Sequence, residues 1–146
     1  MRSRSKARGW ALQGLYAWES RGGQGEDAMR ILQTLFSTLR VSPHNRTYAE
    51  VLVRLVATNV ERIDRILHDS LTNWRLERLA AIDRNVLRLG VAEMLFVDDV
   101  SPRITIREAV QLAEKYGTND SPRFVNGVLD AVMRSEVPDK AARAQP

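Results

Sequence analysis

The side chains with the clearest chemical potential in this sequence are cations near the N-terminus. The first eight residues carry four basic side chains and no acidic one: Arg2, Arg4, Lys6 and Arg8. The whole chain has 22 basic and 18 acidic residues, so these four account for its net charge of +4. Flexible cationic side chains attract phosphate groups whatever the nucleotide sequence. The cluster therefore predicts a polyanionic partner, and such a short segment favours a nucleic acid over a membrane surface.

Groups that could support catalysis or hold a metal are sparse. The chain has no cysteine, which excludes disulfides and thiolate metal sites and is typical of a reducing cytoplasm. The two histidines, His44 and His68, fall on different expected elements. Asp98 and Asp99 are adjacent carboxylates in an expected loop, where neighbouring side chains point apart. Because no nucleophile is paired with a base, the sequence predicts neither an enzyme nor a cofactor or metal site.

The length and hydropathy of the chain define its broad class. A chain of 146 residues is long enough for one domain with its own core. None of its apolar stretches approaches the roughly 20 residues that span a bilayer. The N-terminal segment is basic but lacks the apolar core of a signal peptide. We therefore expect a soluble, cytoplasmic protein without a membrane partner.

Apolar residues recur with helical spacing along the chain, and no credible strand pattern interrupts them. The expected helices cover residues 5–19, 26–39, 48–68, 79–97, 105–117 and 122–135. Thr47 with Glu50 and Thr105 with Glu108 have capping-box spacing, which predicts two helix N-termini. The pattern predicts an all-α bundle.

A short polar connection is expected before the last helix. Gly117 is predicted to end the preceding helix in a left-handed conformation, and Ser121 is predicted to cap the next one. Beyond that helix, residues 136–146 are polar and lack periodicity, so we expect a disordered tail.

The helix expected from Leu79 to Val97 is apolar on almost every side, which predicts that several neighbours cover it. Four charged residues interrupt it: Asp83, Arg84, Arg88 and Glu93. Either they lie on the one strip that the neighbouring helices leave in water, or that strip is a contact surface for a partner.

Aromatic residues suggest a second kind of contact. Arg123, Phe124 and Asn126 follow the expected N-cap, where free backbone N–H groups favour an anion. The Phe124 ring offers a stacking face for a base, and the Asn126 amide offers a paired donor and acceptor. The alternative is that Phe124 belongs to the core and Asn126 caps a neighbouring turn. Tyr16, on the first helix, is likewise either a core residue or an exposed ring on which a base stacks.

Four blocks of the sequence together resemble the NusB family of transcription antitermination factors. They are the basic segment leading into Ala11, Leu15, Tyr16 and Trp18, then Asp83–Glu93, Ile106–Ala113 and Ser121–Asp130. The last three blocks also occur in NusB-like domains fused to RNA cytosine methyltransferases. Here the basic segment is present and no methyltransferase domain follows, which favours the freestanding factor.

The resemblance implies a fold and a function. The fold is an all-α bundle of about six to seven helices within one domain, 1–135, with sub-bundles at about 1–75 and 76–135. The function is binding of the boxA element of nascent ribosomal RNA, as a single strand, together with the small-subunit ribosomal protein that doubles as NusE. Such a complex joins other Nus factors on RNA polymerase and suppresses termination. Some relatives self-associate, so a homodimer stays open.

On this resemblance, the candidate site residues form two groups. The RNA-binding candidates are Arg2, Arg4, Lys6, Arg8, Tyr16, Arg84, Arg123, Phe124 and Asn126. The NusE-binding candidates are Asp83, Arg88, Glu93 and Pro102. The chain departs from the family pattern at Ala92, Pro102 and Arg107, and the first two lie near the surface that contacts NusE in relatives. The alternative function is a protein–protein interaction scaffold without a direct RNA role, for which the basic segment would be dispensable.

Overall fold

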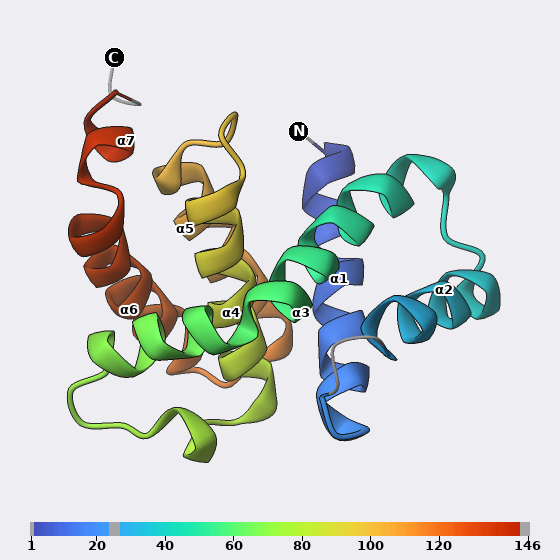
Figure 1. The fold of residues 1–146 in the computed structure, drawn as a ribbon, viewed down its shortest axis with the longest axis horizontal. Coiled ribbons are helices and arrows are strands. Elements are labelled where there is room, and N and C mark those ends of the chain that lie inside the picture. The colour runs from blue at the N-terminus through green and yellow to red at the C-terminus, as the bar shows by residue number, and fades with distance from the viewer. Residues whose placement is uncertain (1, 24–26, 144–146) are drawn as a thin grey trace. The chain divides into compact units, whose positions relative to one another are not determined.

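The computed structural model describes residues 2–23 and 27–143, and over these residues it contains only helices, which confirms the all-α prediction (Figure 1). The side chains of residues 2 and 3 are outside the description. The helices are α1 (Arg2–Ser20), α2 (Asp27–Leu39), α3 (Pro43–Ser70), the 3-10 helix η1 (Leu76–Arg78), α4 (Ala81–Phe96), α5 (Pro102–Tyr116), α6 (Ser121–Glu136) and α7 (Pro138–Arg143). None of the described helices is long and apolar enough to cross a membrane.

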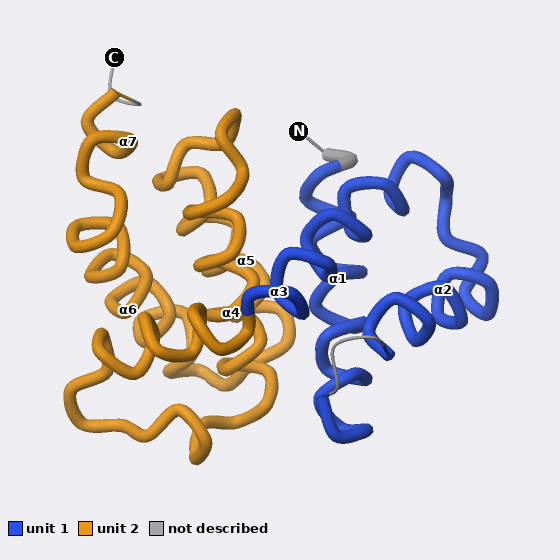
Figure 2. The backbone as a smooth tube through the Cα atoms, viewed as in Figure 1, with its two compact units in different colours: residues 1–59 blue, residues 60–146 orange. Residues whose placement is uncertain are grey.

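The chain divides into two compact units, residues 1–59 and 60–146 (Figure 2). The division falls inside α3 at Asn59, where a φ of −116° and a ψ of 19° interrupt the helix. The Asn59 amide donates a hydrogen bond to the Leu55 carbonyl at 2.8 Å, a side-chain contact of the kind that bends helices. The resemblance places the division near residue 75 instead, and the helical spacing that continues across Asn59 through Val56 and Val60 gives no sign of the break.

The first unit is built from the apolar faces of α1, α2 and the first half of α3. Its most deeply buried large side chains are Leu12, Leu15, Trp18, Leu32, Phe36 and Leu52. Gly14 of α1 allows a close approach of α2, since a Cβ atom there would lie 2.8 Å from Leu32 Cδ1. These residues recur at helical spacing, so the core of this unit follows directly from the sequence pattern.

The second unit is organised around α4, which packs against α5 and α6. Its buried apolar residues lie on several faces and include Val86, Leu87, Leu89, Val91, Ala92 and Met94. Gly90 allows α6 to approach, since a Cβ atom there would lie 2.7 Å from Leu129 Cδ1. The prediction that several neighbours cover this helix is therefore confirmed.

Both predicted capping boxes are wrong. Helix α5 begins at Pro102, and the hydroxyl of Ser101 accepts a hydrogen bond from the Arg103 N–H at 3.2 Å. Thr105 lies inside the helix, buried, and its hydroxyl donates to Glu93 Oε1 at 2.7 Å. Helix α3 likewise begins before Thr47, at Pro43. A hydroxyl at capping-box spacing can serve a tertiary contact as well as a helix end, and spacing alone does not separate the two.

The connection before α6 also differs from the prediction. Gly117 has a φ of −95° and a ψ of −162°, so it is extended and not left-handed. A side chain is excluded there for another reason, because a Cβ atom would lie 2.5 Å from Ser121 Oγ. Ser121 is the first residue of α6, and its hydroxyl accepts a hydrogen bond from the Thr118 N–H at 3.0 Å.

Residues 138–143 form α7, where the sequence predicts a disordered tail. Ala141 is buried, and the Lys140 ammonium donates to the carbonyls of Met94 at 2.8 Å and Val97 at 2.7 Å. These carbonyls end α4 and need partners outside that helix. Burial lowers the pKa of Lys140 from its usual value, while the nearby carboxylates of Asp98 and Glu93 act in the opposite direction. Lys140 and the buried Ala141 thus hold in place a segment that has no apolar periodicity.

Candidate nucleic-acid interface

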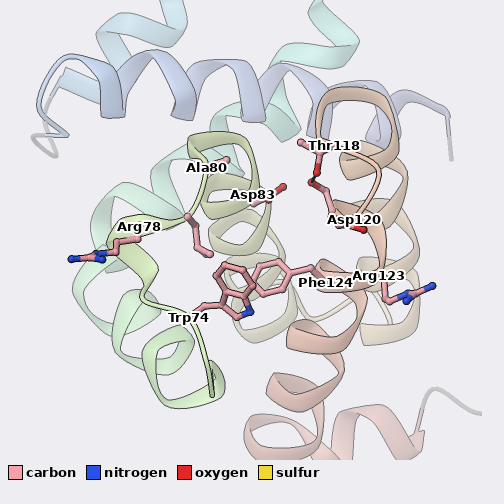
Figure 3. Close-up of a pocket in the computed structure, with 10 residues that line it drawn as sticks. Trp74, Arg78, Ala80, Asp83, Thr118, Asp120, Arg123 and Phe124 are labelled. Carbon is pink, nitrogen blue, oxygen red and sulfur yellow. Dashed lines mark hydrogen bonds between the residues drawn. The ribbon is translucent and has the colours of Figure 1, made fainter.

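A pocket of about 490 Å³ opens in the second unit, where the segment around η1 meets the start of α6 (Figure 3). The ten residues that line it are Trp74, Arg78, Leu79, Ala80, Asp83, Thr118, Asp120, Ser121, Arg123 and Phe124. Trp74 is 63% exposed and Phe124 is half-buried. Their ring centroids lie 5.9 Å apart in an edge-to-face arrangement, with an interplanar angle of 71°. We call this site the aromatic pocket.

The charges around the aromatic pocket are unevenly placed. Arg78 and Arg123 are exposed, and Figure 3 shows their guanidinium groups pointing outward on opposite sides of the aromatic pair. Asp83 and Asp120 contribute carboxylates on the side of the turn before α6. An aromatic surface between two cations suits a planar ring that carries phosphate on either side, as a nucleotide within an RNA strand does.

Asp83 occupies an unusual position in the aromatic pocket. Its Oδ1 atom is buried and has no hydrogen-bond partner among the described residues. A buried acceptor without a partner costs free energy, and such atoms are rare in folded proteins. The sequence places Asp83 on a protein-binding strip, but in the structure it lines the same pocket as Phe124 and Arg123.

The N-terminal cations have different environments. The Arg4 guanidinium lies over the Tyr48 ring at 4.4 Å from the centroid, and the Arg8 guanidinium lies at 5.7 Å from the same centroid. Arg8 is only 5% exposed, and its part in phosphate binding stays a prediction. Arg4 and Arg8 are one helical turn apart, and the same spacing that groups them on α1 brings both to Tyr48. Lys6 is exposed, while the Arg2 side chain lies outside the described residues.

The other predicted RNA-binding residues also have different surroundings in the structure. Tyr16 is 47% exposed, so its ring lies at the surface of the first unit and not in the core. Asn126 is exposed but lines a different pocket from Phe124. Arg84 donates to the carbonyls of Leu76 at 3.2 Å and Leu79 at 2.7 Å. Arg84 therefore ties η1 to α4, and its role in RNA binding stays a prediction.

The candidates for NusE binding are partly or fully buried in the second unit, and their role stays a prediction. Glu93 is 1% exposed and Pro102 is buried. The Arg88 side chain is 11% exposed and makes two hydrogen bonds to the Asp64 carboxylate, at 2.8 and 2.9 Å. Thr105 and Asp64, which are distant in sequence, supply hydrogen-bond partners for Glu93 and Arg88 inside the unit. Ala92 is buried as well, so this departure from the family pattern affects packing inside the unit.

A second pocket, of about 540 Å³, lies along α5 and α6. It is lined by Arg103, Ile106, Arg107, Val110, Gln111, Glu114, Asn126 and Asp130. It combines cations, carboxylates and apolar side chains, a mixture typical of the surfaces by which proteins bind other proteins. We call it the mixed-charge groove. Its cations Arg103 and Arg107 have the i,i+4 spacing of one helix face, which is the signal that could have revealed it from sequence.

The described residues thus define an all-helical binding protein with two surface pockets, and they contain no group of three or more His, Asp or Glu residues that could hold a metal ion. The sequence model of the NusB family matches residues 5–134, so the chain belongs to the NusB family. Its members are transcription antitermination proteins, not enzymes.

Individual relatives agree with this assignment. The transcription antitermination protein NusB of Geotalea daltonii is 38% identical over 96% of this chain and 99% of its own length. NusB of Sorangium cellulosum is 42% identical over 92% of this chain and 94% of its own length.

Two solved structures show the same fold. One is NusB of T. maritima, with a TM-score of 0.86, 32% identity and coverage of 96% of each chain. The other is a crystal structure of the antitermination factors NusB and NusE in complex with double-stranded RNA. It has a TM-score of 0.82, 33% identity and coverage of 92% of this chain and 98% of that chain.

Proposed function

We propose that this protein acts in antitermination by binding the boxA element of nascent ribosomal RNA in the cytoplasm, together with the small-subunit ribosomal protein NusE. This complex then joins other Nus factors on RNA polymerase. The observation that carries the RNA part of the proposal is the aromatic pocket, in which exposed Trp74 and half-buried Phe124 lie between two outward-pointing arginines. Base–aromatic stacking with cations beside it is the usual way in which proteins hold single-stranded RNA.

The aromatic pocket also supports the proposal that the bound RNA is single-stranded. A base can enter between a ring and its neighbours only when it is not paired and stacked within a duplex. The structural relative with NusE holds double-stranded RNA. The aromatic pocket of this chain nevertheless needs an unpaired base, so a duplex of the same sequence should compete poorly with the single strand.

A different surface supports the proposal of a protein partner. The mixed-charge groove presents Arg103 and Arg107 beside Glu114 and Asp130, and Ile104 is 39% exposed on the same helix α5. Complementary charges at such a surface fix the register of a protein partner. We therefore place NusE at the mixed-charge groove and RNA at the aromatic pocket. A protein–protein interaction scaffold without an RNA role would use the mixed-charge groove alone.

The N-terminal cations should appear in the salt dependence of RNA binding. Replacing Arg2, Arg4 and Lys6 by Ala should make the slope of log affinity against log salt shallower by about 2, at roughly 0.7 per phosphate contact with a single strand. Arg8 is left in place because it is buried. The measurement is a titration of labelled boxA RNA at several salt concentrations.

A matched control removes the same charge elsewhere. Arg21, Arg54 and Arg65 are exposed on other parts of the chain, and their replacement by Ala should leave most of the slope intact. Equal slopes for the N-terminal triple variant and the wild-type protein would rule out phosphate binding by this segment.

Phe124 should contribute to RNA affinity through its ring. Replacing it by Ala should weaken boxA binding by about 1–3 kcal/mol, the usual range for a base stacked on an aromatic side chain. Because Phe124 is half-buried, some loss of stability is expected too, so the melting temperature is measured alongside the RNA titration. A clear melting shift with undiminished affinity in the folded fraction would show that the ring serves packing only.

A further inference from the structure

We propose that Tyr48 is a positioning residue for RNA binding, which holds the Arg4 guanidinium where it contacts a phosphate of the bound strand. This inference rests on the proposed RNA-binding function and names a residue through which one of its cations acts. Tyr48 lies on α3 and is not among the residues that the sequence singles out. Its ring acts through Arg4, without touching the RNA.

The position of Arg4 depends on a contact between two helices. The Arg4 guanidinium lies over the Tyr48 ring at 4.4 Å from the centroid, well inside the range of a cation–π contact. Further along α1, a Cβ atom at Gly14 would lie 3.7 Å from Val53 Cγ2, so α1 runs against α3 at that point as well. Both residue pairs belong to the first unit (Figure 2). Packing of α1 on α3 therefore decides where the Arg4 side chain lies.

A second cation reaches the same ring. The Arg8 guanidinium lies 5.7 Å from the Tyr48 centroid, one helical turn from Arg4. Arg8 is buried, whereas Arg4 keeps part of its surface in solvent. Arg8 therefore adds to the positive potential at this end of α1, and Arg4 is the one of the two that can touch a phosphate.

The chemistry of a guanidinium allows both contacts at once. An arginine uses the face of its planar group against an aromatic ring, and it uses in-plane N–H groups to bind a phosphate. A long side chain normally loses rotamer freedom when it binds a ligand, and this loss weakens the affinity. A ring that holds the guanidinium beforehand reduces that loss. Tyr48 thus raises RNA affinity by ordering Arg4 in the free protein.

The test measures the affinity of the full chain for labelled single-stranded boxA RNA at one fixed salt concentration. Tyr48→Leu keeps an apolar side chain but removes the π face, so it should weaken binding by about fivefold, the cost of ordering one long side chain. Tyr48→Phe keeps the π face and should bind within about twofold of the wild-type protein. Because Tyr48 is half-buried, thermal melting of each variant gives the folded fraction to which the affinity refers.

A double-mutant cycle with Arg4→Ala separates positioning from a merely structural role. Arg4→Ala should weaken binding at least as much as Tyr48→Leu, and adding Tyr48→Leu to it should cause no further loss beyond about twofold. A ring that only stabilises the fold would act equally with and without Arg4. Phe96→Leu is the matched control, because it removes a ring that lies 5.4 Å from the Arg62 guanidinium in the second unit, and it should leave RNA affinity unchanged.

The outcomes separate this inference from the function on which it rests. Wild-type RNA affinity in the folded Tyr48→Leu protein would overturn the positioning role and leave RNA binding in place. An equal loss with and without Arg4, or an equal loss in Tyr48→Phe and Tyr48→Leu, would also overturn it. Absence of boxA binding by the wild-type protein would remove the proposed function, and this inference with it.

Discussion

Replacing Glu93 by Lys is expected to destabilise the protein by more than about 3 kcal/mol, because it puts an uncompensated cation into the core. Glu93 is 1% exposed, and its carboxylate accepts a hydrogen bond from the buried Thr105 hydroxyl at 2.7 Å. This contact joins α4 to α5 in the second unit. The larger lysine side chain would lose the hydrogen bond and leave the Thr105 hydroxyl without its acceptor.

Urea denaturation followed by circular dichroism measures this effect, and Glu61→Lys is the matched control. Glu61 is exposed on α3, so the same charge reversal there should change stability by less than about 0.5 kcal/mol. A Glu93→Lys variant as stable as the control would contradict the buried position of this carboxylate. The prediction also means that charge reversal at Glu93 cannot probe partner binding, since unfolding would remove every surface at once.

Replacing Arg88 by Ala should cost about 3 kcal/mol of stability, because it leaves a partly buried carboxylate without its cation. The Arg88 guanidinium makes two hydrogen bonds to Asp64, at 2.8 and 2.9 Å, and the Asp64 side chain is 30% exposed. A third contact, at 3.3 Å, reaches Asn85 Oδ1. The pair links the second half of α3 to α4.

A double-mutant cycle isolates the energy of this pair. Arg88→Ala and Asp64→Ala together should cost clearly less than the sum of the two single changes, since the second removal deletes a charge that is already unpaired. Arg65→Ala, on an exposed position of the same helix as Asp64, is the control and should have little effect. Strict additivity of the two changes would contradict a direct ion pair.

The helices of this protein could be predicted because their apolar residues keep a 3.6-residue period. Most of the contacts that their charged side chains make with other helices could not be predicted. Asp83, Arg84, Arg88 and Glu93 interrupt an apolar helix, and the sequence predicts either a solvent-exposed strip or a contact surface for a partner. In the structure, Arg88 and Glu93 are paired inside the unit by Asp64 and Thr105. Periodicity reports which face of a helix is apolar, whereas these pairings depend on how distant helices are packed.

The candidate site was predictable where a local signal existed. Arg123 and Phe124 stand out because they follow a helix start, and both line the aromatic pocket. Trp74 and Arg78 lie in a connection with no helical pattern and were not predicted, although a tryptophan beside arginines in a polar segment is an available signal. Lys6 and Arg8 are both cations at the start of α1, but Arg8 is buried and its guanidinium lies near the Tyr48 ring of α3, a contact that the local sequence does not show.

The central claim is that one protein binds single-stranded RNA and a ribosomal protein on different surfaces of the second unit. The most direct measurement is a titration of labelled single-stranded boxA RNA, alone and with purified NusE, with unlabelled duplex of the same sequence as competitor. We predict binding by the protein alone, tighter binding with NusE through a shared coupling free energy, and weak competition by the duplex. The absence of any RNA binding, with or without NusE, would contradict the claim.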